Sequence, residues 1–130
     1  MKLLHACARL LALFTLLAGN ASAHHSTAMF DAEKTVTMSG TVKEFQYTNP
    51  HSWLIIEVKN DDGSLATWGF EAEGPTTLMR SGIRKSTIPV GTRITITGHP
   101  MTDGRPAAAW VKAVLEDGTE LNPRNGFVPR

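Results

Sequence analysis

Two adjacent histidines follow a cleavage motif of small residues near the start of the chain. Signal peptidases cut after sequences of the type Ala21-Ser22-Ala23, and His24 and His25 come directly after it. Cleavage would give His24 a free amine. The amine and the His24 imidazole could then clamp one Cu(II) ion, or the amine, the next amide nitrogen and the His25 imidazole could chelate it. Nitrogen ligands in a tetragonal arrangement suit Cu(II), which also heads the divalent affinity order.

A third histidine, His51, could complete a three-nitrogen site. It follows the turn sequence Thr48-Asn49-Pro50 and precedes an apolar run, so a side chain placed there could reach the N-terminal arm. We therefore predict metal ligands at His24, His25 and His51, with copper as the preferred ion.

Other candidate ligands, and a simpler interpretation, remain open. The other thioether and imidazole candidates are Met29, Met101 and His99. His99 directly precedes Pro100, and we expect it to lie in an ordinary loop. No pair of zinc-type ligands a few residues apart supports the site. In the simpler interpretation, His24 and His25 belong to a solvated terminus and His51 is a turn residue.

A second hypothesis for the same region needs no metal. Trp53 has the opposite parity from Leu54 and Ile56 in a predicted strand, so its ring should be exposed or half-buried near His51. Alternatively, this ring closes one end of the barrel. An aromatic ring beside a histidine at a strand entrance can bind a small ligand or a partner protein. The residues predicted for this alternative site are Tyr47, His51 and Trp53.

The residue types favour a binding protein over an enzyme or a nucleic-acid-binding protein. Cys7, the single cysteine, lies in the predicted signal peptide, and no serine stands at a strand–turn–helix elbow. Dispersed glycines form no phosphate-binding loop. Removing Lys2 and Arg9 leaves 11 of the 13 basic residues against 12 acidic ones. A chain without basic excess has little electrostatic attraction for nucleic acid.

Short alternating segments predict an all-β domain with one short helix. Apolar residues alternate over 35–42, and the parity changes after Lys43-Glu44, which predicts a bulge or a bend near Gly40 to Glu44. Further strands are predicted over 52–59, 65–72, 92–98 and 108–115, with a hairpin turn over 60–63 and a helix over 76–81. Five strands with a helix between the third and fourth follow the order of the OB-fold, a small Greek-key barrel. A small sandwich is the alternative architecture.

The predicted domain organisation has four parts. They are a signal peptide over 1–23, an N-terminal arm over 24–34, an OB-like barrel over 35–121 and a flexible C-terminal tail over 122–130. The signal peptide combines Lys2 and Arg9 with an apolar stretch over 10–18 that is too short to span a bilayer. No other segment is apolar enough to cross a membrane. We therefore expect a periplasmic protein whose partner is another periplasmic protein or a small ligand.

Four short sequences resemble a known family. They are AHHSTAMFD over 23–31, SGTVKEF over 39–45, TNPHSW over 48–53 and WGFE over 68–71. Together they resemble small exported bacterial proteins catalogued as domain of unknown function 6152, over nearly the whole chain after the signal peptide. The resemblance implies a periplasmic, β-barrel-like domain. It implies no activity, cofactor or partner.

Overall fold

A computed structural model describes residues 29–125 of the chain. The predicted signal peptide and the predicted ligands His24 and His25 lie outside the described residues. The elements in order are β1 (Val36–Gln46), β2 (His51–Lys59), β3 (Leu65–Glu73), α2 (Pro75–Arg80), the 3-10 helix η2 (Lys85–Thr87), β4 (Arg93–Pro100), β5 (Ala107–Leu115) and β6 (Glu120–Leu121).

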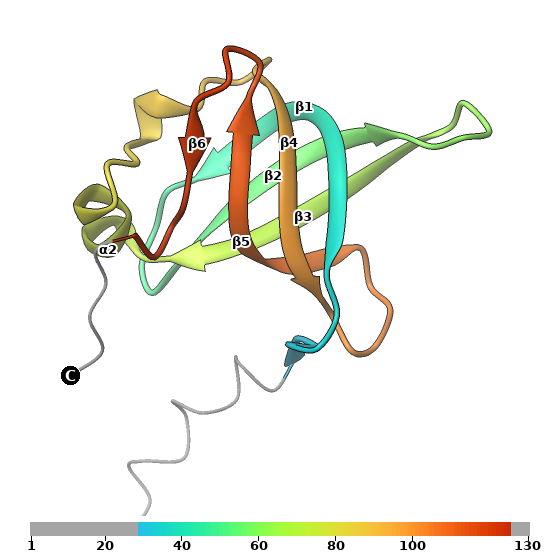
Figure 1. Cartoon of the computed structure of the whole chain (residues 1–130), viewed down its shortest axis with the longest axis horizontal. Coiled ribbons are helices and arrows are strands. Elements are labelled where there is room, and N and C mark those ends of the chain that lie inside the picture. Colours follow the sequence, from blue (N-terminus) through green and yellow to red (C-terminus); the bar gives the residue numbers. More distant parts are fainter. Residues whose placement is uncertain (1–28, 126–130) are drawn as a thin grey trace, which may run out of the picture.

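The strands form one sheet that closes on itself. Its order is β3-β2-β1-β4-β5-β6, and neighbouring strands are antiparallel (Figure 1). A parallel pairing of β3 with β5 joins 69–71 to 107–109 and closes a five-stranded barrel. The short helix α2 follows β3, between the third and fourth strands. The predicted OB-like barrel with one short helix is confirmed.

Strand β1 bends so that it can pair with both β2 and β4. The register against β2 shifts between Val42 and Glu44, which confirms the predicted bulge. The extra residue lets both Val42 and Phe45 point into the core despite their spacing. At Gly40, a Cβ would lie 2.5 Å from the Glu57 carbonyl oxygen, so only glycine allows the strands to approach this closely.

Apolar side chains from every strand fill the barrel. Phe70 and Trp110 are the largest buried side chains, and the rings of Phe45 and Trp110 pack edge to face with centroids 6.4 Å apart. Leu54 and Ile56 alternate along β2 and are fully buried. Each such side chain contributes about 1.5–3 kcal/mol by leaving water. The strands that carry the candidate ligands are therefore held by a continuous core.

The structure differs from the sequence prediction in two places. His99 is part of β4, not of a loop, because Pro100 ends the strand only after His99 has paired with Ala109. The predicted flexible tail begins with packed residues. Pro123 is buried, and the Ser81 hydroxyl donates a hydrogen bond to its carbonyl oxygen at 3.0 Å. Residues 126–130 lie outside the described part of the chain.

Helices of the described residues are short. None of those found between residues 29 and 125 is long and apolar enough to cross a membrane.

Candidate functional site

His51 opens strand β2 and is placed by the turn before it. The Thr48 hydroxyl donates to the His51 carbonyl oxygen at 3.2 Å, and the Ser52 hydroxyl donates to the Thr48 carbonyl oxygen at 3.4 Å. Ser52 is fully buried. Because successive side chains of a strand point to opposite faces, His51 faces the outside of the barrel.

A buried carboxylate contacts the His51 ring. Nδ1 of His51 lies 2.8 Å from Oε1 of Glu71, and the two side chains are 36% and 9% exposed. The register explains the contact, since β2 pairs Trp53 with Glu71 and places His51 diagonally from it on the same face. The second carboxylate oxygen of Glu71 is buried without a hydrogen-bond partner among the described residues.

The surroundings of Glu71 perturb its acidity. Burial raises the pKa of the Glu71 carboxyl above its usual value, because a charge is costly away from water. His51 opposes this rise in pKa, Glu73 adds to it and Arg124 opposes it. A buried acid in contact with an imidazole is a common feature of functional sites.

A second histidine, His99, is held in a similar way. Its Nδ1 lies 2.7 Å from the carbonyl oxygen of Lys34. A carbonyl oxygen can only accept a hydrogen bond, so Nδ1 of His99 carries a proton, and Nε2 is the ring nitrogen left for another partner. In the sheet, β4 pairs His99 with Ala109, and β5 pairs Ala109 with Glu71. His99, Ala109 and Glu71 therefore lie in one row across three strands.

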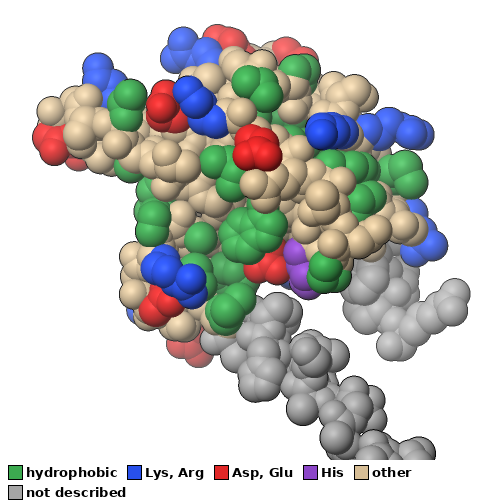
Figure 2. Space-filling model, turned by 180° about the vertical axis from the view of Figure 1, so that it is seen from behind, with side chains coloured by type: hydrophobic (Ala, Val, Ile, Leu, Met, Phe, Trp, Pro, Cys, Tyr) green, Lys and Arg blue, Asp and Glu red, His purple; other side chains and the backbone are tan. Residues whose placement is uncertain are grey.

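Both histidines line one cavity of about 240 Å³. Figure 2 shows one face of the molecule, on which a histidine side chain lies beside acidic and hydrophobic side chains. The small Ala109 leaves space between the strands that carry Glu71 and His99. The cavity residues come from the N-terminal segment, β2 to β5 and the C-terminal segment: Phe30, Ala32, His51, Glu71, Ala72, Glu73, His99, Ala109 and Arg124.

The N-terminal segment is fastened beside this cavity. The Asp31 amide donates to the Pro100 carbonyl oxygen at 2.8 Å, and the Thr102 amide donates to the Met29 carbonyl oxygen at 2.9 Å. Phe30 forms an isolated bridge with Met101. The described chain therefore begins next to the end of β4 and the loop that follows it (Figure 1).

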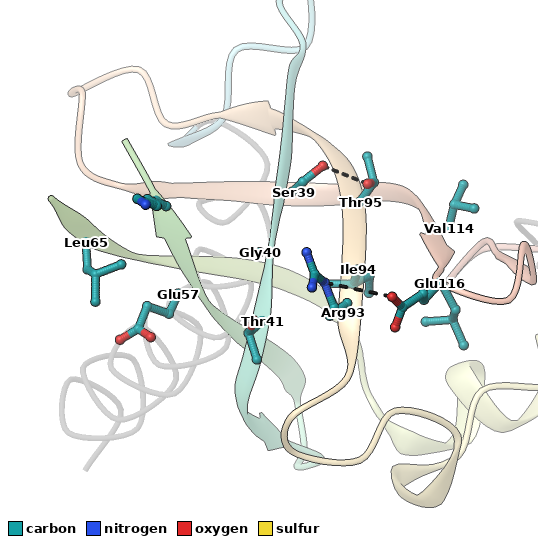
Figure 3. A pocket seen from close by; sticks show the side chains of 12 residues that line it. Ser39, Gly40, Thr41, Glu57, Leu65, Arg93, Ile94, Thr95, Val114 and Glu116 are labelled. Atoms are coloured by element: carbon teal, nitrogen blue, oxygen red, sulfur yellow. Dashed lines mark hydrogen bonds and ion pairs between the residues drawn. The ribbon is translucent and has the colours of Figure 1, made fainter. Parts of the chain in front are cut away.

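A larger cavity of about 430 Å³ lies elsewhere on the barrel (Figure 3). Two pairs of its polar side chains contact each other: the Ser39 and Thr95 hydroxyls are 2.8 Å apart, and Arg93 Nε lies 4.0 Å from Glu116 Oε1. Arg93 and Glu116 are 75% and 73% exposed. Well-solvated and mutually paired groups have little chemistry to offer, so we place the candidate site at the smaller cavity.

The structure brings together some of the residues predicted from sequence. His51 lies in the cavity, whereas His24 and His25 lie outside the described residues. The Tyr47 hydroxyl is 3.1 Å from the Pro75 carbonyl oxygen and 2.9 Å from that of Ile83, so it serves the fold. Trp53 is half-buried, on the same face as Glu71.

Two residues of the site were missed or undervalued by sequence reasoning. Glu71 is one of several carboxylates in alternating strands, and only the closure of β3 on β5 distinguishes it. His99 was expected in a loop. Among residues 29–125, no group of three or more His, Cys, Asp or Glu side chains is arranged to hold a metal ion. To hold a metal ion, the described part of the cavity would therefore need ligands from elsewhere in the chain.

Comparison with known proteins identifies a family. The model of a family of unknown function, DUF6152, matches residues 12–110. Neither the curated proteins nor the solved structures gave a match. The match spans most of the chain and includes every cavity residue except Arg124. The chain belongs to this family of unknown function, DUF6152, as its resemblance to that family had suggested.

Proposed function

We propose that this protein is an exported, periplasmic binding module that holds one copper ion at the cavity beside His51. Its ligands are Nε2 of His51 and nitrogens of His24 and His25, at a terminus created by cleavage after Ala23. The observation that carries the proposal is the 2.8 Å contact between His51 Nδ1 and Glu71 Oε1.

The Glu71 contact matches what metal-ligating histidines need. Such a histidine donates its other ring N–H to a carboxylate or a carbonyl, which fixes the ring and makes it a better ligand. With its Nδ1 held by Glu71, His51 has Nε2 available for a metal ion. The burial of Glu71 strengthens the hydrogen bond that orients His51, because water competes poorly for a carboxylate that is 9% exposed.

The length of chain between His24 and Met29 supports ligands from the N-terminus. His24 precedes Met29 by five residues, and five residues of extended chain span about 17 Å. Met29 is tied to Thr102 by a backbone hydrogen bond, and the next residue, Phe30, lines the cavity. A short segment starting at this point could therefore bring a terminal amine and an imidazole to His51.

The nitrogen-rich ligand set favours copper. Imidazole and amine nitrogens suit Cu(II), and Cu(II) binds most tightly among the common divalent ions at sites of this kind. The Glu71 carboxylate would orient His51 and lower the net charge of the loaded site. The activity proposed is therefore metal binding, with no reaction assigned.

Calorimetric titration with Cu(II) tests the proposal on the protein that begins at His24. We expect the protein to bind one copper ion per chain. The same protein with one alanine before His24 should bind the ion at least about tenfold more weakly, because the His24 nitrogen is then a peptide amide and not a terminal amine. His51→Ala should weaken binding about 10–100-fold. Gln46→Ala, an exposed change outside the cavity, is the matched control. Absence of binding, or equal affinities in all four proteins, would contradict the proposal.

A further inference from the structure

We infer that His99 is a second barrel ligand of the same metal ion, so that β2 and β4 each supply one imidazole Nε2. This inference rests on the proposed function and adds a ligand to it. Divalent transition metals that accept imidazole nitrogen are the ligand class concerned.

The two histidines share an unusual set of contacts. His51 and His99 are 48 positions apart in the sequence, yet they line one cavity. The Nδ1 atom of each ring lies against an acceptor: Glu71 Oε1 at 2.8 Å for His51 and the Lys34 carbonyl oxygen at 2.7 Å for His99. Carboxylate and backbone carbonyl are the two protein partners that usually orient metal-bound histidines. With Nδ1 occupied in this way, Nε2 is the ring nitrogen of each histidine that is left to bind a metal ion.

A bulge in β5, opposite Thr97 and Gly98, selects the neighbour of His99. The β4–β5 register shifts between Thr97 and Gly98, so His99 pairs with Ala109, where an unbroken register would pair it with the buried Trp110. Ala109 faces the cavity and adds only a methyl group to its wall. The bulge therefore sets His99 in the row that contains Glu71.

Glycine makes this bulge possible. A Cβ at position 98 would lie 2.6 Å from the Ala109 carbonyl oxygen and 2.9 Å from the Ala108 Cβ. Separations this short do not occur between real Cβ atoms and backbone atoms, so β4 can approach β5 here only with glycine. A feature that costs backbone freedom on folding and places a histidine beside a cavity fits a binding role.

The N-terminal segment orients His99 as well as carrying the predicted terminal ligands. Lys34, whose carbonyl accepts from His99, forms a 2.8 Å ion pair with Asp31. The Asp31 amide in turn donates to Pro100, the residue after His99. The same segment thus follows the predicted ligands His24 and His25 in sequence and forms the hydrogen bond that fixes the His99 ring.

The decisive experiment compares Cu(II) complexes of the wild type, His51→Ala and His99→Ala, each beginning at His24. Affinity is measured by competition with a chelator, and coordinated nitrogens are counted from the superhyperfine splitting in electron paramagnetic resonance. We expect His99→Ala to weaken binding about 10–100-fold and to remove one nitrogen. Thr97→Ala, on the same face of β4, should do neither.

Two further variants control for misfolding and distinguish failure of this inference from failure of the proposed function. His99→Gln can still donate to the Lys34 carbonyl, so it replaces His99→Ala if that variant unfolds. In the form with one extra alanine before His24, the residual affinity should depend on both His51 and His99. If His99 variants keep wild-type affinity and nitrogen count while His51→Ala loses them, this inference is wrong and the proposed function stands. If no protein binds Cu(II), both are wrong.

Discussion

Nδ1 of His51 lies 2.8 Å from Oε1 of Glu71, which is 9% exposed and reaches diagonally across the β2–β3 pair. The other oxygen of this carboxylate is buried without a hydrogen-bond partner among the described residues. Burying a polar atom unpaired costs free energy that an apolar side chain would not. The barrel therefore gives up stability at the position that orients His51.

Replacing Glu71 should weaken metal binding without removing a ligand. In Glu71→Gln the amide keeps the volume of the carboxyl but not its charge, so His51 loses its strongest orienting partner. We expect Cu(II) affinity to fall about 10–100-fold, measured by chelator competition. Glu73→Gln, on the same strand and paired with Arg124, is the control. Equal losses in the two variants would mean that charge alone, not orientation, matters.

Filling the cavity should block the site while the fold survives. Ala109 lies between Glu71 and His99 in the sheet, so Ala109→Leu places a branched side chain where the ion would bind. We expect at least tenfold weaker Cu(II) binding and a change of no more than about 1 kcal/mol in the free energy of unfolding. Ala107→Leu, two residues earlier on the same face and outside the cavity, should keep wild-type affinity. Wild-type Cu(II) affinity in Ala109→Leu would show that the copper site lies outside this cavity.

Glycine at position 98 should be required for both stability and binding. In Gly98→Ala the new Cβ would meet the Ala109 carbonyl oxygen at 2.6 Å, so β4 must move away from β5. We expect a loss of about 1–3 kcal/mol in unfolding free energy and weaker Cu(II) binding, since His99 moves with the strand. Urea denaturation and metal titration measure the two effects. A variant as stable as the wild type would show that the bulge tolerates a side chain.

The barrel core should carry most of the stability. Ile56 is fully buried on β2, so Ile56→Ala removes apolar contacts and leaves a cavity in the core. We expect the free energy of unfolding to fall by about 2–5 kcal/mol in urea denaturation. Leu65 is 64% exposed, and Leu65→Ala should change stability by less than about 0.5 kcal/mol. Similar effects at the two positions would contradict the described core.

The β2–β3 hairpin should make stability depend on acid pH through Asp62. The Ser64 hydroxyl and amide donate to Asp62 Oδ1 at 2.5 and 2.9 Å, and these bonds hold the pKa of Asp62 below its ordinary value of 3.8. A carboxyl with a lowered folded-state pKa stabilises the fold above its unfolded-state pKa, and this contribution disappears as pH falls through the folded-state value.

The matching measurement compares thermal unfolding of the wild type and Asp62→Asn between pH 7 and pH 2. The variant should melt at lower temperature at pH 7, and the difference should shrink below about pH 4. Asp61→Asn, at the next position, is the control. A difference between wild type and Asp62→Asn that stays constant down to pH 2 would show that the charge of Asp62 is not involved.

Much of the fold could be predicted because the relevant forces are local. Alternation in 35–42, the parity change near Lys43 and the Asn60-Asp61-Asp62-Gly63 turn each depend on neighbours in sequence. The turn carries a positive φ of 84° at Gly63, the conformation that glycine adopts most readily. Element order then led to the barrel. The same reasoning identified His51, because it stands at a turn before an obvious strand.

The rest of the site depends on contacts between distant strands. Glu71 looks like Glu57 in sequence, and only pairing of β3 with β5 buries it. His99 was expected in a loop because Pro100 cannot donate a ladder hydrogen bond, but a proline is tolerated as the last residue of a strand. Pro123 is buried, and its carbonyl oxygen accepts a hydrogen bond from Ser81, which follows α2. No local pattern encodes these contacts.

The most direct test of the account is an anomalous difference map at the copper absorption edge, from crystals of the Cu(II)-loaded protein that begins at His24. The account predicts one peak in the cavity, about 2.0–2.1 Å from His51 Nε2, with His99 Nε2 and the terminal nitrogens around it. A peak distant from His51, or no peak in protein that has been shown to be fully folded, would contradict it.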